Sequence, residues 1–133
     1  MSDNPALLLP PYGGFLGILT DRDAAGALLF RMPFGYRVVG RPGFLHGGAI
    51  AGLLEIAAVG TLRDALADDP GASVKPITVT VDFMRGGRER DTFAAALITR
   101  LGARIANVEA FAWQDDRDKP IAAARMNLMV RRG

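Results

Sequence analysis

The sequence has no cysteine and only one histidine, His46, among its 133 residues. Without cysteine, the chain can form no disulfide and no thiolate zinc site, and a cysteine nucleophile is excluded. A single histidine also excludes a metal site built from several histidines of one chain. The sequence therefore predicts no metal centre.

An excess of one charge is also missing, because 16 lysines and arginines stand against 14 aspartates and glutamates, leaving a net charge of +2. Arginines of the second half are interspersed with acids and lack interleaved aromatic residues, so nucleic-acid binding is not favoured. A solvated charged rim explains them better, although a smaller anion such as a nucleotide phosphate could bind there. These arginines are Arg85, Arg88, Arg90, Arg100 and Arg104.

No hydrophobic run has the length of a membrane span. The short leucine run near the N-terminus follows no basic leader and is interrupted by prolines, so we expect no secretory signal. The apolar part of residues 47–66 falls short of a span and includes a glutamate. The expected protein is soluble and cytoplasmic, without a membrane segment.

The chain is rich in apolar residues, which make up half of its sequence. The length fits one domain with a real core, residues 1–133, in which 1–14 form an N-terminal extension. So much apolar surface on a short chain also predicts that part of it is buried between subunits.

Turn residues divide the chain into a hairpin, one long helix and four strands. Apolar runs flank a polar turn within residues 15–33, and a glycine-rich loop leads from there to the helix. Asp68-Asp69-Pro70-Gly71 ends the helix, because this stretch does not easily continue one. The later strands are predicted at residues 77–83, 91–101, 105–114 and 120–131, with turns at Gly102 and 115–118.

Consecutive strands joined by short turns are antiparallel neighbours, so this order predicts an α+β fold. In 77–83, apolar residues at every second position alternate with Thr78, Thr80 and Asp82, which predicts a half-buried strand. The later strands are rich in alanine, which is a poor strand former. Small side chains would, however, let a helix lie close to the sheet.

The helix is unusually apolar. From Gly47 to Leu62, every residue except Glu55 is glycine, alanine, a larger aliphatic residue or threonine. A helix that is apolar on nearly all faces has to be covered on nearly all faces. One sheet covers one side, so the curl of the sheet, loops or a second copy of the protein must cover the rest. We therefore expect a sheet wrapped around a central helix.

Glu55 has no cation three or four residues away, so no local ion pair explains it. Taken alone, it fits a carboxylate without catalytic function better than a catalytic one. The residues before the helix change this interpretation. Gly47 and Gly48 would leave backbone N–H groups free at the helix start, where a carbonyl oxygen gaining negative charge can bind. For His46, a packing or capping role and a catalytic role are about equally favoured.

His46-Gly47-Gly48, followed by Glu55 nine residues after the histidine, resembles the signature of hotdog-fold acyl-CoA thioesterases of the phenylacetic-acid-degradation type. This branch also includes 4-hydroxybenzoyl-CoA thioesterases that carry a glutamate. The stretch PITVTVDFMRGG is similar to the family's first strand after the helix, and Gly102 matches a glycine between two of its long strands. The resemblance covers about residues 15 to 131 and implies a hotdog fold with five to six antiparallel strands.

The resemblance implies that Glu55 acts as nucleophile or general base at the thioester carbon. Gly47 would donate its amide to the thioester oxygen, with His46 orienting the loop or the carbonyl. In the family, the acid of one subunit faces the glycine loop of another. The resemblance therefore implies a homodimer, or a tetramer built from two dimers, with a shared site.

One departure from the family concerns substrate orientation. Six residues before the histidine the family usually has asparagine or glutamine, whereas this chain has Gly40, and Arg41 is our candidate for its replacement. Phe44 could line an aryl or medium-chain pocket, but a core position explains it equally well. Gly48 and Arg85 complete the predicted substrate-binding residues.

We therefore expect an acyl-CoA thioesterase acting on an aryl- or medium-chain acyl-CoA, with coenzyme A as part of the substrate and no further cofactor. A hotdog enoyl-CoA hydratase or dehydratase and a non-catalytic acyl-CoA-binding dimer remain alternatives. Hydratases of this fold place a proline–glycine just ahead of the acid-bearing helix. Here Pro42-Gly43 precedes the histidine and Gly47-Gly48 opens the helix, which favours the hydrolase.

Overall fold

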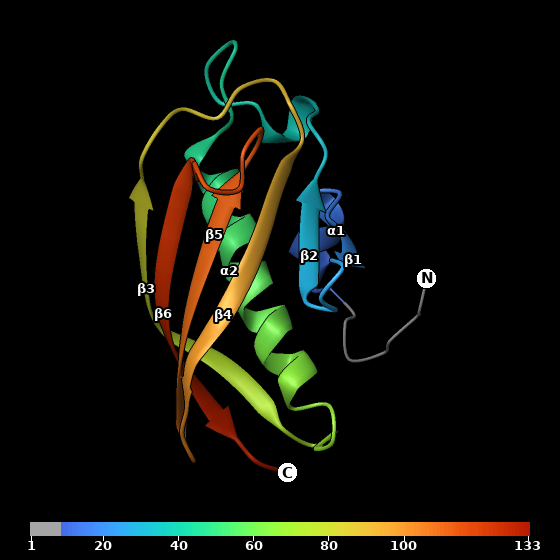
Figure 1. The fold of residues 1–133 in the computed structure, drawn as a ribbon, viewed down its shortest axis with the longest axis vertical. Helices are drawn as coiled ribbons and strands as arrows, with labels where there is room; N and C mark the ends of the chain where they lie inside the picture. The colour runs from blue at the N-terminus through green and yellow to red at the C-terminus, as the bar shows by residue number, and fades with distance from the viewer. Residues whose placement is uncertain (1–8) are drawn as a thin grey trace.

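A computed structural model describes residues 9–133 as a six-stranded antiparallel sheet that curves around one long helix, α2 (Figure 1). This confirms the predicted α+β class and architecture. Strand order across the sheet is β1-β2-β4-β5-β6-β3, so β1 and β3 form its edges. The elements are α1 (Pro11–Phe15), β1 (Leu19–Arg22), β2 (Leu28–Met32), η2 (Tyr36–Val38), α2 (Gly47–Ala65), β3 (Ser73–Phe83), β4 (Thr92–Leu101), β5 (Ile105–Trp113) and β6 (Ala122–Arg131).

The concave face of the sheet carries small side chains where the helix packs on it. We call these residues of β4, β5 and β6 the alanine floor: Ala94, Ala106, Ala110, Ala112, Ala122 and Ala124. Leu53, Leu54 and Ala57 of α2 are fully buried in the same core cluster. The predicted role of the alanines, to let the helix lie close to the sheet, agrees with this packing.

The three strands after β3 begin and end within two residues of their predicted ranges, and they are antiparallel neighbours in chain order. Gly102 lies in the turn between β4 and β5, where its N–H donates to the Ile105 carbonyl at 2.9 Å. A Cβ added to Gly102 would lie only 2.8 Å from that oxygen, so the turn requires glycine.

The first arm of the predicted hairpin is wrong. Residues that should form this arm belong largely to α1 and the turn after it, and β1 starts only at Leu19. Pro11 suits the first position of α1, because its ring fixes φ and it needs no partner for an N–H. Gly17, with φ of 72°, then turns the chain into β1, which pairs with β2 as an antiparallel hairpin.

Strand β3 is longer than predicted and is not half-buried in the single chain. It begins at Ser73 and runs along β6 to Phe83. Ile77, Val79 and Phe83 of its apolar face are 56%, 38% and 56% exposed. The physical reason is its place at the sheet edge, where α2 and β6 cover too little of these side chains.

Helix α2 is covered by the sheet on one side, so the expected cover on nearly all faces does not occur within one chain. Exposed and half-buried residues follow one another along its uncovered side at three- and four-residue spacing. We call this side the open stripe; it consists of Gly48, Ala51, Glu55, Val59 and Arg63.

Part of the predicted N-terminal extension packs on the helix. Residues 1–8 lie outside the described residues, and α1 begins soon after them. Tyr12 of α1 lies on Gly52, where an added Cβ would approach its ring to 2.6 Å. Among residues 9–133, no helix combines the length and hydropathy that crossing a membrane requires.

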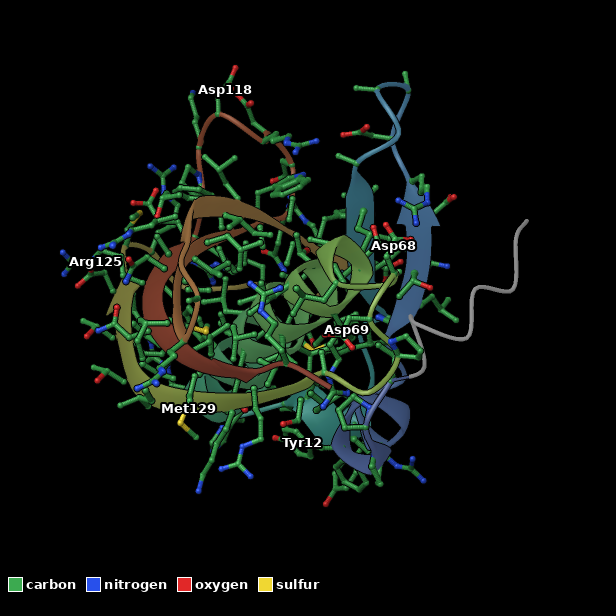
Figure 2. The ribbon with its side chains drawn as sticks, turned by 90° about the horizontal axis from the view of Figure 1, so that it is seen from below. Tyr12, Asp68, Asp69, Asp118, Arg125 and Met129 are labelled. Carbon is green, nitrogen blue, oxygen red and sulfur yellow. The ribbon has the colours of Figure 1, made fainter. Side chains whose placement is uncertain are left out.

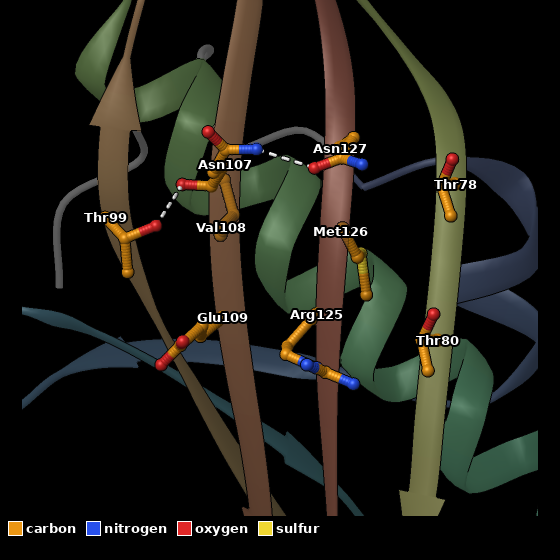
Figure 3. Close-up of a pocket in the computed structure, with 9 residues that line it drawn as sticks. All are labelled: Thr78, Thr80, Thr99, Asn107, Val108, Glu109, Arg125, Met126 and Asn127. Carbon is orange, nitrogen blue, oxygen red and sulfur yellow. Dashed lines mark hydrogen bonds between the residues drawn. The ribbon is translucent and has the colours of Figure 1, made fainter.

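The convex face of the sheet has a polar hollow at its centre (Figure 3). Asn107 donates to Oδ1 of Asn127 at 2.6 Å, and the Thr99 hydroxyl donates to the Asn107 carbonyl at 3.1 Å. Arg125 and Met129 of β6 point away from the helix on this side (Figure 2). None of the predicted site residues lines the hollow, so the candidate site lies elsewhere.

Candidate active site

The start of α2 combines a histidine cap with one free amide. His46 is the N-cap, and its Nδ1 accepts a hydrogen bond from the Gly48 N–H at 2.8 Å. The prediction of a free Gly48 amide is therefore wrong. The Gly47 N–H has no hydrogen-bond partner within residues 9–133, so it is available to a ligand at the positive end of the helix dipole.

The cap also defines the chemistry of His46. A neutral ring whose Nδ1 accepts a hydrogen bond carries its proton on Nε2. The His46 backbone N–H donates to the Val38 carbonyl at 2.8 Å, which ties the residue to the preceding loop. Since the side chain is exposed, Nε2–H is available as a donor to a substrate oxygen.

Gly40 packs directly against the backbone of His46. A Cβ added to Gly40 would lie 3.0 Å from the His46 Cα and 3.3 Å from its nitrogen. The Gly40 N–H donates to the Phe44 carbonyl at 2.9 Å and closes this loop. An asparagine or glutamine here would have to push the histidine away. Gly40 thus shapes the site by close packing and offers no side chain to a substrate.

Two arginines stack on Phe44, in the loop before the cap. The guanidinium carbons of Arg41 and Arg88 lie 3.9 Å and 4.3 Å from the centroid of the ring. Neither arginine has a carboxylate partner among the described residues. Cation–π contacts position the two guanidiniums without neutralising them. This arginine–phenylalanine stack therefore presents two guanidiniums without a carboxylate partner within residues 9–133.

The loop between β3 and β4 is held in place by Gln114. Oε1 of Gln114 accepts from the Arg88 N–H at 2.9 Å, and its Nε2 donates to the carbonyls of Arg88 and Arg90 at 3.0 Å and 3.2 Å. A Cβ added to Gly86 would lie 2.9 Å from the Phe44 ring, so this loop is in contact with the stack. The hydrogen bonds fix Arg88 before any ligand arrives.

The end of β3 lies beside the free amide. A Cβ added to Gly47 would be 3.6 Å from two carbons of the Phe83 ring, which is ordinary van der Waals contact. Arg85 follows two residues later, with its N–H donating to the Ile121 carbonyl at 3.2 Å and its side chain exposed. The amide and the arginine-bearing loops therefore share one end of the molecule, at the top of Figure 1.

Glu55 lies apart from this group, on the open stripe. It is exposed, and its side chain forms no hydrogen bond or ion pair within the described residues, which agrees with the predicted lack of a local ion pair. It lines a cavity of about 190 Å³ between α2, β3 and the segment before α1. The other lining residues are Leu9, Pro10, Ile56, Val59, Gly60, Arg63, Val74 and Pro76.

Within one chain, Glu55 and Gly47 cannot act on the same carbonyl group. An α-helix rises about 1.5 Å per residue, so the eight residues between them correspond to about 12 Å along the axis. A hydrogen bond spans only about 3 Å. The structure brings together His46, Gly47, Arg41 and Phe44, but it leaves Glu55 on a separate patch.

Comparison with known proteins identifies the family. Residues 42–121 match the thioesterase superfamily, and this segment includes the cap, Glu55 and β3 to β5. The chain belongs to the thioesterase superfamily. Its curved sheet around one long helix is the hotdog fold, as the sequence resemblance implies.

Individual proteins resemble most of the chain. A Halobacterium salinarum protein named "putative esterase" is 27% identical over 117 residues, covering 81% of this chain and 77% of its own length. A Bacillus halodurans protein solved with CoA has a TM-score of 0.83 at 22% identity, covering 93% of this chain and 80% of that one. The phenylacetic acid degradation-related protein of Ralstonia eutropha JMP134 has a TM-score of 0.80 at 22% identity, covering 92% and 91%. The resemblance to hotdog-fold thioesterases is confirmed by the family match and the fold.

Some residues of this thioesterase-superfamily site were not predicted from the sequence. Phe83 and Gln114 reach the loops from strand ends far away in the chain, so no local pattern indicates them. Arg88 is in the predicted charged rim and gains its place only through the contact with Phe44. Arg63 could have been predicted from the sequence, because it follows Glu55 by eight residues and so lies on the same helix face.

Proposed function

We propose that this thioesterase-superfamily chain hydrolyses acyl-CoA thioesters as a homodimer with two shared active sites. The observation that carries the proposal is the split catalytic set. A free Gly47 amide lies at one end of α2, and an unpaired Glu55 lies about 12 Å along the same helix. Neither half is a hydrolase alone, and a second copy would supply the missing half to each.

The β3 edge is the proposed dimer contact. It is eleven residues long and exposes apolar side chains, which suits antiparallel pairing with the β3 of a second copy. A two-fold axis between Val79 and Thr80 would set Pro76 opposite Phe83 of the partner subunit. Pro76 is a wall of the Glu55 cavity, and Phe83 lies on Gly47. The same pairing would therefore bring Glu55 of each chain to the Gly47 amide of the other.

The proposed reaction needs only water as co-substrate. The thioester oxygen would accept a hydrogen bond from the Gly47 N–H, where the helix start stabilises its developing negative charge. Glu55 would take a proton from a water molecule that attacks the thioester carbon. Collapse of the intermediate would break the carbon–sulfur bond, and the proton would pass from Glu55 to the CoA thiolate. Direct attack by the Glu55 carboxylate would use the same placement: it would release CoA and leave a mixed anhydride, which water would then hydrolyse to the free acid and Glu55.

The arginine–phenylalanine stack is the proposed site for the nucleotide end of CoA. Guanidinium groups bind phosphate oxygens with paired hydrogen bonds, and neither Arg41 nor Arg88 has a carboxylate to displace. Arg85 on the same loop would add a third cation. CoA in the Bacillus halodurans relative supports this class of ligand. Apolar walls of the Glu55 cavity support an aryl or medium-chain acyl group.

Replacing Glu55 with alanine should lower thioester hydrolysis by about two to four orders of magnitude, because the base or nucleophile is lost. The fold should survive, since the exposed carboxylate has no partner in the described chain. Thiol release from a panel of acyl-CoA substrates measures the change, and circular dichroism checks the fold. Glu55→Gln is the matched control for side-chain volume. Near-normal turnover in either variant would remove Glu55 from the mechanism.

Subunit exchange tests the shared site. Glu55→Ala chains and Gly47→Val chains should each form nearly inactive dimers, because valine obstructs the amide and crowds Phe83. After mixing, about half of the dimers are mixed, and each holds one intact and one doubly damaged site. Activity should recover to about a quarter of wild type if the sites are independent. No recovery after exchange confirmed by mass would show that both groups act within one chain.

Gly40 favours a second candidate, binding of acyl-CoA without hydrolysis, because it removes the amide that the family uses to orient substrate or water. Binding of an acyl-CoA without thiol release would support this candidate. Hydration of an enoyl-CoA without thiol release would instead support the hydratase alternative.

A further inference from the structure

The cavity beside Glu55 contains a second charged group that the proposed hydrolysis does not use. Glu55, Val59 and Arg63 follow one another on the open stripe at four-residue spacing. All three line this cavity, and Glu55 and Arg63 are the charged residues among its lining within residues 9–133. The remaining walls, from Leu9 to Pro76, are apolar side chains and one glycine. The cavity thus has an acid at one position, a cation at another and apolar surface between them.

Arg63 has no partner inside the described chain. It forms no ion pair and no side-chain hydrogen bond, although the next residue, Asp64, is paired with Arg22 at 3.1 Å. It does not neutralise Glu55 either, because the two residues are about 12 Å apart along the helix axis. A cation beside apolar walls, without an ion-pair partner in the described chain, is suited to an anionic group brought by a ligand.

We propose that Arg63 selects acyl groups whose far end carries a carboxylate, so that the preferred substrates are CoA thioesters of medium-length dicarboxylic acids. This inference rests on the proposed function, because it takes the thioester carbon to lie at Glu55. The methylene chain then follows Val59, Gly60 and Pro76 along the apolar wall, and the distal carboxylate meets the guanidinium. A planar guanidinium binds a carboxylate through two parallel hydrogen bonds, which favours this end group over a hydroxyl.

The same geometry sets a length requirement. In a short diacid the second carboxylate would lie close to Glu55, where two negative charges repel each other. In a longer diacid, the second carboxylate would lie beyond Glu55 and reach Arg63. Discrimination should therefore appear only above a threshold chain length, and a neutral acyl group of equal length should lack it.

Matched pairs of substrates test the inference: succinyl- with butyryl-CoA, adipoyl- with hexanoyl-CoA and suberoyl- with octanoyl-CoA. For the wild-type protein, kcat/KM should favour the diacid about tenfold or more in a longer pair, as expected for one charge-assisted contact, and not in the shortest pair. In Arg63→Met, which keeps an unbranched apolar stem but removes the charge, this ratio should fall to about one or below. Arg104→Met, an exposed arginine outside the cavity, should keep the wild-type ratio.

The outcomes separate this inference from the proposed function. Equal efficiency toward the diacid and the monoacid in both longer pairs would overturn the role of Arg63 and leave the thioesterase intact. Absence of any hydrolysis would overturn the proposed function. The role of Arg63 would then be tested by comparing the dissociation constants of two acyl-CoA ligands. Suberoyl-CoA should bind about tenfold more tightly than octanoyl-CoA, and Arg63→Met should abolish the difference. Equal dissociation constants would overturn the inference. A ratio unchanged in a folded Arg63→Met protein, checked by thermal melting, would do the same.

Discussion

The two edges of the sheet differ in length and chemistry. β1 has four residues and includes Asp21 and Arg22. The Arg22 side chain is already engaged, with Nη2 at 3.1 Å from Asp64 and Nη1 donating to the Gly26 carbonyl at 3.0 Å. β3 has eleven residues, and its exposed side chains include Ile77 and Val79.

Edge strands present unpaired backbone groups, and proteins commonly protect them by shortness and charge. β1 has both protections, whereas β3 has neither along its apolar stretch. A long, apolar and unprotected edge would promote aggregation unless it has a specific partner. The difference between the edges supports a molecule with one edge closed to pairing and the other reserved for a second copy.

The largest effect is expected from a charge on the open edge. Val79→Lys should convert the proposed dimer to a monomer, because it would place two lysines beside the proposed two-fold axis and bury them in apolar surroundings. Hydrolysis should fall by about two to four orders of magnitude, as for Glu55→Ala, because each monomer holds only half of a site. Size-exclusion chromatography with light scattering and a thiol-release assay measure both changes.

Leu19→Lys is the matched control, because Leu19 is an exposed apolar residue on the closed edge, 50% accessible. It should leave assembly and activity unchanged. If Val79→Lys stays dimeric and active, the β3 edge is not the contact that completes the site.

A smaller effect is expected from opening the closed edge. Replacing Asp21 and Arg22 together with valine removes both charges from β1 and adds residues that favour strands. The edge then becomes apolar, so oligomers larger than the wild-type assembly should form at micromolar concentration. Sedimentation velocity detects them. The control pair Asp21→Ser and Arg22→Ser removes the same charges without adding apolar surface and should not polymerise. If the valine variant sediments like the serine variant, an apolar surface on β1 is not enough to open this edge to pairing.

The smallest effect concerns the turn behind β1. The Ala27 N–H, followed by the Ala25 N–H and Arg117, holds the pKa of Asp23 below its ordinary value. A lowered pKa in the folded state contributes stability that is present above the ordinary aspartate pKa, about 4, and is lost as the pH falls below it. Asp23→Asn should therefore melt below wild type at neutral pH, and the gap should narrow in acid. A gap that is constant with pH would show that the charge of Asp23 does not contribute.

The sequence predicts the parts of the fold that depend on local pattern. Gly102 and the aspartates at 115–118 mark turns chemically, so β4, β5 and β6 are located within two residues. The sequence could not predict what covers β3. The alternation of apolar and polar residues around Val79 indicates that one face is covered, but not whether the same chain or a second copy covers it. The first hairpin arm is misplaced because the apolar run at 15–19 fits a strand as well as the end of a short helix.

The candidate site divides in the same way. His46, Gly47 and Glu55 follow from a motif with fixed spacing. The same spacing predicts that the Gly47 amide and the Glu55 carboxylate lie at different points along one helix. The occupied amide of Gly48 depends on a side-chain rotamer of His46 that spacing does not give. Gln114 and Phe83 come to the site from strand ends, which only the sheet register brings near the loops.

The alanine floor limits which amino-acid substitutions this protein can tolerate. Adding a methylene to a filled core is destabilising by about 1–3 kcal/mol, and the strain is relieved by shifting a neighbouring element. Here the neighbour is α2, whose depth sets the position of Glu55. A shift of about 1 Å can reduce catalysis by 100-fold. Substitutions at Ala110 or Ala124 would therefore be selected against because they lower activity, even when the chain still folds. Libraries that seek a new substrate preference should vary the cavity walls and keep the floor fixed.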